Sequence, residues 1–457
     1  MSKLKTIPQY LLGLFTLFAF ACEQTPTIDY VLFSGTITNT DGSYVTVKKE
    51  GFSMDIDLNA DGTFSDTLRL DRGYYRFYSG RERTNIFLDK GFVINLSLDQ
   101  PMFDETLTFN GEGKGTNINN YLANKARLDE ELTVDFQTLF SKDENEFVET
   151  VKDWQSKMDQ LLAGANIMDE TFVATEKRNL NYEYLTQFAN YEYYHQYAVK
   201  DSDFKVSDGF NDNLAGIDLN NESDFKSLDT YKNLLQSYFG AMIESGEVAK
   251  AFEAIKSIQS NAIKEGLVPD YTYKVQPGNE DAEAIYEGIL SVTSDSATIA
   301  ELNVKIEKIR KLQTGMPSPT FTYHSIVGDT VSLDDLQGKY LYVDVWATWC
   351  GPCLREIPSL KTLENDFHGA PIEFVSISID VDKDFEKWQQ MVADKELKGV
   401  QLFADKNWKS DFVQAYAIDG IPRFILIDPK GNTVDPNAPR PSDPEIREIL
   451  QGISSNS

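Results

Sequence analysis

Cysteine and histidine are both scarce in this chain, with three residues of each among 457. Three cysteines are too few for the disulfide framework that stabilises small secreted domains. A structural zinc site needs four ligands, mostly Cys and His, at short spacings. After Cys350 and Cys353 the sequence offers only His368. The chain therefore argues against a disulfide scaffold and against a complete zinc site at these cysteines.

Positive charge is also in short supply. The chain holds 43 Lys and Arg against 72 Asp and Glu, a net charge of -29, and the acidic residues are spread along it. Such a surface argues against nucleic acid or an anionic membrane face as a partner. With 41% hydrophobic and 25% charged residues, the composition is that of a globular protein, and the length favours two or three domains.

An apolar run from Tyr10 to Ala21 follows Lys3 and Lys5 near the N-terminus. It is too short to span a bilayer as a helix and has the length of a signal-peptide core. We therefore expect residues 1–21 to be removed as a signal peptide.

The run ends in Ala-Phe-Ala-Cys-Glu at residues 19–23, which resembles the lipobox of bacterial lipoproteins. In that motif the cysteine, here Cys22, is acylated and becomes the mature N-terminus. Phe20 departs from the small residue usual at its place, so ordinary signal-peptidase cleavage is the alternative. With lipid on Cys22, residues 22–27 would be a tether, and one cysteine pair would remain.

Residues 28–112 show short alternating segments, such as 44–47, 52–58 and 93–98, separated by Asp-Gly turn signals. This spacing predicts an antiparallel β-sandwich. Asp57, Asn59, Asp61 and Gly62 match the start of a calcium-binding EF-hand loop. However, Leu68 stands where the loop needs a bidentate Glu, so we expect a hairpin turn instead.

Residues 113–313 contain little proline and long stretches with helical spacing of apolar residues, which predict an all-α region. A helix expected over residues 176–197 is dense in aromatic side chains. This aromatic face would be either a ligand-binding surface or core, and core is the more common use.

Residues 314–457 begin at a Gly-Met-Pro-Ser-Pro boundary, and strand-like and helix-like segments then alternate before a closing hairpin and a terminal helix. This order predicts a mixed sheet covered by helices. The full prediction is a multidomain chain: an antiparallel β-sandwich, a central all-α region and a C-terminal α/β domain.

The segment Trp-Ala-Thr-Trp-Cys-Gly-Pro-Cys at 346–353 stands between a strand-like run and a helix-like run. A C-x-x-C motif in this setting is typical of redox proteins. The first sulfur lies at a helix N-terminus, where free N–H groups and the helix dipole favour the thiolate. Cys350 is thus the candidate nucleophile and Cys353 the candidate resolving thiol. Half of a zinc site, or two buried thiols, is the alternative.

This motif, the Val343-Asp344-Val345 strand before it and Gly420-Ile421-Pro422 after it resemble the thioredoxin superfamily, and more narrowly the TlpA/ResA-like thiol-disulfide oxidoreductases of the bacterial envelope. The resemblance covers residues 314–457. It implies a thioredoxin fold, reversible exchange through a Cys350–Cys353 disulfide with no other cofactor, and redox cycling with an envelope partner.

Two acidic residues are further candidates. Asp344 lies on the expected central strand, where burial should raise the pKa of its carboxyl and let it hold a proton near neutral pH. The resemblance implies proton transfer to and from Cys353; a solvent-facing Asp at a strand edge is the alternative. Glu356 lies on the same helix face as Cys353, and in ResA-like members a Glu here shapes the thiol pKa. Alternatively, it only complements the helix dipole.

Five residues in and around the motif are expected to face the substrate: Trp349, Gly351, Pro352, Ile421 and Pro422. Ile421-Pro422 matches the cis-proline loop of the superfamily, whose backbone could pair with an extended peptide. Arg423 follows where a Thr is common in relatives, which puts specificity there in doubt. Trp349 would be part of the docking surface, with pure packing as its alternative.

The expected reaction is thiol-disulfide exchange in which Cys350 attacks a partner disulfide and Cys353 resolves the product. Gly351 and Pro352 form the dipeptide of thioredoxin, which favours a reductase. Its partners would be disulfide-bearing envelope proteins and a membrane electron donor. The alternatives are an isomerase or oxidase, a binding lipoprotein with a minor redox role, and a thiol peroxidase, whose P-x-x-x-T-x-x-C arrangement is missing here.

Overall fold

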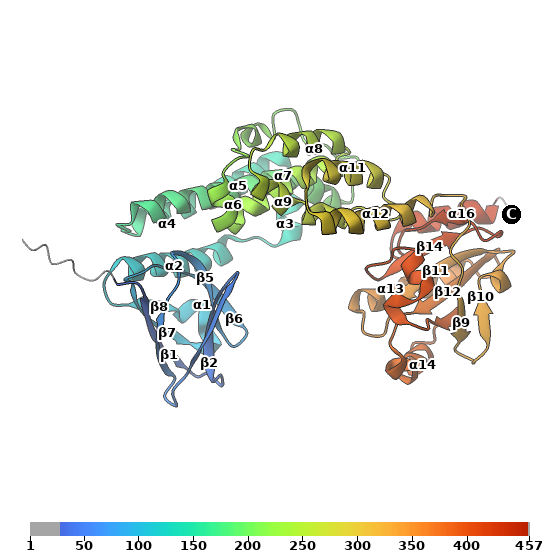
Figure 1. The fold of residues 1–457 in the computed structure, drawn as a ribbon, viewed down its shortest axis with the longest axis horizontal. Coiled ribbons are helices and arrows are strands. Elements are labelled where there is room, and N and C mark those ends of the chain that lie inside the picture. Colours follow the sequence, from blue (N-terminus) through green and yellow to red (C-terminus); the bar gives the residue numbers. More distant parts are fainter. Residues whose placement is uncertain (1–27, 456–457) are drawn as a thin grey trace, which may run out of the picture. The chain divides into compact units, whose positions relative to one another are not determined.

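A computed structural model describes residues 28–455 (Figure 1), and the chain divides into two compact units. Within the described residues, the first unit comprises 28–139 and 145–181, and the second comprises 140–144 and 182–455. The expected signal peptide, the lipobox and Cys22 lie outside the described residues. Between residues 28 and 455, no helix is both long and apolar enough to cross a membrane.

The first unit contains a sandwich of two four-stranded sheets. One sheet has the order β4-β1-β7-β8 and the other β3-β2-β5-β6. The strands are β1 (Val31–Thr38), β2 (Tyr44–Lys49), β3 (Phe52–Asp57), β4 (Thr63–Leu68), β5 (Gly73–Ser79), β6 (Glu82–Leu88), β7 (Val93–Asp99) and β8 (Thr108–Asn110). Alternate residues of these strands face inward, and Phe33, Phe64 and Phe77 pack together in the core.

Two details of this sandwich differ from the sequence prediction. Strands β1 and β7 pair in parallel, because alternation shows which face is buried but not the direction of a neighbour. The turn containing Asp61 and Gly62 joins β3 to β4, which belong to different sheets. It is therefore a crossing between the sheets and not a hairpin, with Asp61 accepting hydrogen bonds from the Thr63 backbone and hydroxyl.

Helices α1 (Phe103–Thr106), α2 (Lys114–Leu132), most of α4 (Glu144–Gly164) and the first part of α5 (Glu170–Val199) belong to the same unit. Asn119 on α2 explains part of this attachment, since its side chain bonds both the N–H and the carbonyl of Phe87 on β6. The helical stretch expected at residues 113–313 is thus divided between the two units.

The second unit begins with further helices: α6 (Glu222–Ser227), α7 (Asp229–Glu244), α8 (Val248–Ser257), α9 (Asn261–Leu267), α10 (Pro269–Thr272), α11 (Ala282–Val292) and α12 (Ser296–Arg310). The aromatic face of α5 contributes to their core. Tyr191 is fully buried and packs against His195, Phe204 and Phe210. This part of the face is core and not a ligand surface.

The C-terminal part is built on a seven-stranded mixed sheet in the order β10-β9-β13-β12-β11-β14-β15. The strands are β9 (Thr322–Ser325), β10 (Thr330–Ser332), β11 (Tyr340–Trp346), β12 (Ile372–Ser378), β13 (Val400–Phe403), β14 (Arg423–Ile427) and β15 (Thr433–Asp435). Strands β11, β12 and β13 are parallel, and β14 is antiparallel to β11. The predicted mixed sheet is confirmed, with the redox motif directly after its central strand.

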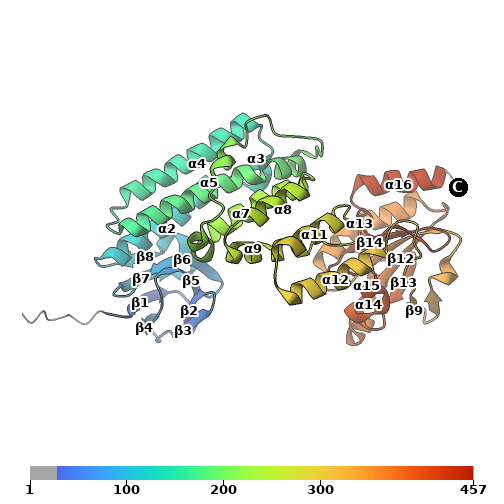
Figure 2. The same ribbon diagram turned by 45° about the horizontal axis from the view of Figure 1, so that its top comes forward.

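Helices cover both faces of this sheet (Figure 2). Helices α13 (Gly351–Asp366) and α16 (Pro444–Ser455) pack on the face that carries Tyr342 and Phe424. Helices α14 (Phe385–Asp394) and α15 (Asp411–Ala415) pack on the face that carries Val343 and Val345. Because β11 is buried on both sides, it reads as a nearly continuous apolar run.

Candidate active site

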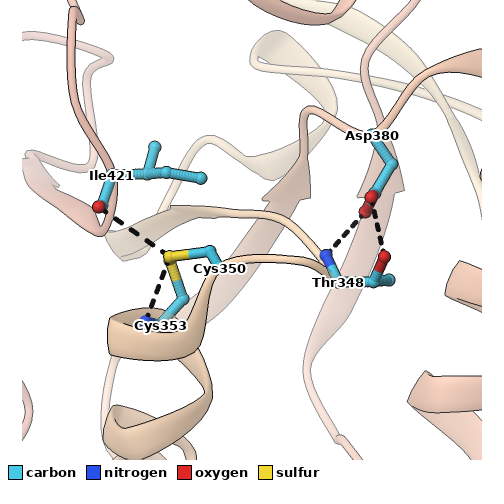
Figure 3. Close-up of a disulfide and its surroundings, with 5 residues drawn as sticks. All are labelled: Thr348, Cys350, Cys353, Asp380 and Ile421. Atoms are coloured by element: carbon cyan, nitrogen blue, oxygen red, sulfur yellow. Dashed lines mark hydrogen bonds between the residues drawn. A yellow bond between two sulfur atoms is a disulfide. The ribbon is translucent and has the colours of Figure 1, made fainter. Parts of the chain in front are cut away.

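The two cysteines lie at the junction of β11 and α13 and are joined by a disulfide (Figure 3). Cys350 is the N-cap of α13, and its Sγ accepts a hydrogen bond from the backbone N–H of Cys353 at 3.1 Å. Each residue is only 4% exposed. Since both sulfurs are bonded to each other, neither is available as a zinc ligand in this structure. The first sulfur lies at the helix N-terminus, where N–H groups and the dipole favour a thiolate once the bond is reduced.

The loop before β14 lies opposite the disulfide. The Ile421-Pro422 peptide bond is cis, and the Ile421 carbonyl oxygen is 3.8 Å from Cys350 Sγ (Figure 3). The sequence resemblance implies a cis-proline loop at this position, and the structure brings the backbone of that loop next to the Cys350 sulfur.

Trp349 immediately precedes Cys350 and is 52% exposed. Its ring contacts the half-buried Trp408, with centroids 6.4 Å apart. A side chain that only packs would be covered, so a large apolar surface remains open beside the disulfide.

Asp344 lies at the centre of the sheet, on β11 between β12 and β14. The pKa of its carboxyl is raised to about 8, first by burial and then by the nearby charges of Glu356 and Glu364, while a hydrogen bond from Ser376 acts in the opposite direction. The solvent-facing alternative for Asp344 is therefore wrong. An acid with a pKa near neutral can both store and release a proton under ordinary conditions.

Glu356 is buried on α13, one helical turn after Cys353. Its carboxylate accepts two hydrogen bonds of 3.0 Å, from the backbone N–H and the hydroxyl of Ser442. Ser442 stands just before α16. Glu356 thus does more than complement the helix dipole, because it links α13 to the C-terminal segment and places a negative charge near Asp344.

Comparison with known proteins agrees with this geometry. The family model described as Redoxin matches residues 313–450. The thiol-disulfide oxidoreductase ResA of Bacillus thuringiensis (strain Al Hakam) is 30% identical over 125 residues, which are 27% of this chain and 69% of that protein. The chain belongs to the thiol-disulfide oxidoreductases of the thioredoxin superfamily.

Other members of the family show the same partial coverage. A ResA of Bacillus cereus is 28% identical over 144 residues, which are 32% of this chain and 80% of that protein. A solution structure from Bacteroides vulgatus, of a protein described as a thiol-disulfide oxidoreductase, is 48% identical and covers 32% of this chain and 94% of that one, with a TM-score of 0.28. The two ResA relatives do not favour the thiol peroxidase alternative.

Sequence reasoning missed Asp380, which holds the loop before the cysteines of this oxidoreductase (Figure 3). Asp380 is fully buried just after β12. It accepts hydrogen bonds from the Thr348 backbone N–H at 2.9 Å, the Thr348 hydroxyl at 2.8 Å and the Ser378 hydroxyl at 2.8 Å. The sequence offered one indication of this role: Asp380 comes just after a buried parallel strand, next to the strand that precedes the cysteines.

Arg423 has a different environment from that of a residue facing a substrate peptide. It is 6% exposed, and its guanidinium donates to the side-chain oxygens of Asn437 and Gln276. Burial lowers its pKa from the usual value. Neither of these partners is on the cis-proline loop, so the unusual Arg serves a contact between segments.

Proposed function

We propose that this protein reduces disulfides in other proteins, with Cys350 and Cys353 as its dithiol. The observation that carries the proposal is the Cys350–Cys353 pair at the N-terminus of α13, with the Ile421 carbonyl 3.8 Å from the first sulfur. The Gly-Pro dipeptide between the cysteines supports the reducing direction, because thioredoxin carries the same dipeptide and has a potential of about -270 mV.

The reaction begins from the dithiol form. Cys350 thiolate attacks one sulfur of the partner disulfide, which breaks the partner S–S bond, forms a mixed disulfide and releases one partner thiolate. Cys353 then loses its proton and attacks Cys350 Sγ, which releases the second partner thiolate and forms the Cys350–Cys353 bond seen here. The partner gains two electrons and this chain loses two, so an external thiol donor must reduce the pair again.

Asp344 is the proposed acceptor of the Cys353 proton. Its pKa of about 8 is close to the pH at which the reaction would run. A general base with such a pKa is partly deprotonated at that pH and is still basic enough to accept the thiol proton. Glu356 supports this role through its charge, which helps to raise the Asp344 pKa.

The proposed setting is the bacterial envelope. The support is in the sequence: a signal-peptide pattern over residues 1–21 and a lipobox ending at Cys22. On this proposal the chain is anchored by lipid, its substrates are disulfide-bearing envelope proteins, and a membrane electron donor returns the electrons. An envelope kept oxidising requires such a donor for any reductase.

Trapping of partners tests the proposal. A Cys353→Ser variant expressed in the envelope should accumulate mixed disulfides through Cys350, because the resolving thiol is absent. The matched control, Cys350→Ser, should accumulate none. If the two variants give the same non-reducing gel pattern, disulfide exchange through Cys350 is wrong.

The direction of the reaction is tested separately by redox equilibration of the cysteine pair. We expect the reduction potential of the pair to be close to that of thioredoxin, about -270 mV. A reduction potential close to that of the oxidant DsbA, about -120 mV, would indicate an oxidase instead.

A further inference from the structure

The cis-proline loop of the C-terminal sheet is held at both of its ends by residues of the helical segment before it. At the C-terminal end stands Arg423, directly after Pro422. Its buried guanidinium donates to Asn437 Oδ1 and, at 3.4 Å, to Oε1 of Gln276 in the loop between α10 and α11. An Arg side chain stays charged and must keep acceptors when buried. Gln276 therefore supplies one of the contacts that fix the start of β14.

The same inter-helix loop approaches the sheet very closely at Gly278. Its φ is +81°, and a Cβ there would lie 2.4 Å from Asn437 Cβ. Only glycine accepts both this backbone conformation and this approach at little cost. The turn at Asn437, which receives the Arg423 guanidinium, is therefore packed directly against the helical segment.

At the N-terminal end of the loop, Asp419 stands two residues before Ile421. Lys305 on α12 forms an ion pair with it at 2.9 Å. The Lys305 side chain is only 16% exposed, whereas that of Asp419 is 58% exposed. The ammonium end of the pair is therefore largely covered by protein, whereas the carboxylate end is open to solvent.

The connection between α12 and the sheet is also fixed by backbone hydrogen bonds. Gly315 N–H donates to the Thr433 carbonyl at 2.8 Å, Thr433 N–H to the Met316 carbonyl at 2.8 Å, and Ser318 N–H to the Gly431 carbonyl at 2.9 Å. This stretch thereby runs along β15, the neighbour of β14. The helical segment is joined to the sheet by a paired strand edge as well as by side chains.

We propose that Gln276 and Lys305 are positioning residues that set the cis-proline loop for protein substrates. This inference rests on the disulfide exchange proposed above. An extended substrate would pair with the loop backbone by strand addition, so its attack geometry depends on where Ile421 stands. A small disulfide that meets only the Cys350 sulfur does not need the loop. Loss of the helical contacts should therefore affect the two kinds of substrate differently.

The test compares two probes with the full chain, reduced beforehand with dithiothreitol that is then removed. Insulin supplies a protein disulfide, and 5,5′-dithiobis(2-nitrobenzoate) supplies a small one. A Gln276→Ala, Lys305→Ala double variant should reduce insulin about tenfold more slowly, within the roughly 10²-fold that a 1 Å misplacement can cost. Its rate with the small disulfide should stay at the wild-type value.

Two further variants sharpen the comparison. Lys308→Ala lies on the same helix, and no side-chain hydrogen bond or ion pair is seen for Lys308 in the part of the chain that the structure describes; both of its rates should match wild type. Lys305→Arg keeps the charge and should retain the wild-type insulin rate. If the double variant fails to fold, Lys305→Ala alone, which removes a partly exposed pair, carries the same comparison.

Three results would overturn the inference. Equal insulin rates for the double variant and Lys308→Ala would show that the contacts do not position the loop. Equal slowing on both probes would show a general structural effect. A wild-type chain that reduces neither probe would remove the proposed function and this inference with it.

Discussion

The two units each bury a carboxylate, and the two sites differ in how the charge is balanced. In the first unit, Glu176 is fully buried and bonded to the Lys125 ammonium, the Tyr74 and Tyr121 hydroxyls and the Asn179 amide. In the second unit, Asp344 has a hydrogen bond from Ser376, and the two charged groups that raise its pKa, Glu356 and Glu364, are also acids. The first arrangement balances the charge of the carboxylate, whereas the second favours the protonated, neutral acid.

This difference follows from the cost of burying a charge. A buried ion with a cation and further donors is stable, but removal of one partner leaves an uncompensated charge. A buried acid among other acids keeps its proton instead, and its pKa rises. Perturbed acids of the second kind gather at active sites, which is where Asp344 lies. The same acid-to-amide substitution should therefore have opposite effects on stability in the two units.

The largest effect is expected for Glu176→Gln. The substitution leaves Lys125 without its counter-charge in a site where the Lys side chain is 16% exposed. We expect a loss of about 3 kcal/mol in the free energy of unfolding of the first unit, the lower end for a broken buried pair. Guanidinium denaturation measures it, with the exposed Glu170→Gln on the same helix as a control that should stay within about 0.5 kcal/mol.

Asp344→Asn should change stability in the opposite direction. In the folded chain this carboxyl has a pKa of about 8, against 3.8 for the ordinary group, so the unfolded chain binds fewer protons between these values and stability falls as pH rises through the window. The amide removes that loss. That loss amounts to about 5 kcal/mol at pH 8, and burying an incompletely paired amide in its place costs roughly 3 kcal/mol. We therefore expect a net gain of roughly 2 kcal/mol at pH 8 and a flatter stability-pH curve, together with slower resolution of mixed disulfides. If the variant is less stable than wild type at pH 8, the claim that Asp344 is a buried acid without a compensating cation is wrong.

A smaller loss is expected for Asp380→Asn, because Asp380 resembles Glu176 in being fully hydrogen-bonded. An amide cannot accept from both Thr348 groups and Ser378 as the carboxylate does. We expect about 1.5 kcal/mol of lost stability, the scale of one hydrogen bond to a charged group, and slower exchange through a loosened loop. Asp382→Asn, two residues further on and exposed, is the matched control; equal effects of the two would refute the anchoring role.

The smallest effect is expected for Glu356→Gln. This change removes a charge that raises the Asp344 pKa, so the pKa should fall and the pH-rate profile of mixed-disulfide resolution should move to lower pH. The loss of stability should be about 1 kcal/mol, because Gln can still accept one bond from Ser442. Stopped-flow measurements over a pH series would show the shift. An unchanged pH-rate profile would show that Glu356 has no influence on the proton transfer.

At this site, the features that depend on residues adjacent in sequence could be predicted, and those that depend on residues distant in sequence could not. The placement of Cys350 at a helix N-terminus depends on adjacent residues, and the burial of Asp344 follows from its Val343 and Val345 neighbours on a central strand. Both could be predicted. Asp380 and Arg423 could not, because their roles depend on residues that meet only after the sheet forms. Their partners are Thr348, 32 residues away, and Gln276, 147 residues away.

The same limit explains the fold. Alternating residues predicted the sandwich strands, but they carry no information on strand direction, so the parallel pairing of β1 with β7 was missed. Helical spacing predicted helices over residues 113–313. It could not show that Asn119 fastens α2 to a strand, so the division of these helices between two units was missed as well.

The account is tested most directly by a single turnover of the reduced full chain with excess insulin. We expect the chain to lose two hydrogens as the Cys350–Cys353 bond forms, and two insulin thiols to appear for each chain oxidised. Mass spectrometry of the chain and titration of the released thiols follow the two changes together. A chain that stays reduced while insulin keeps its disulfides would contradict the account.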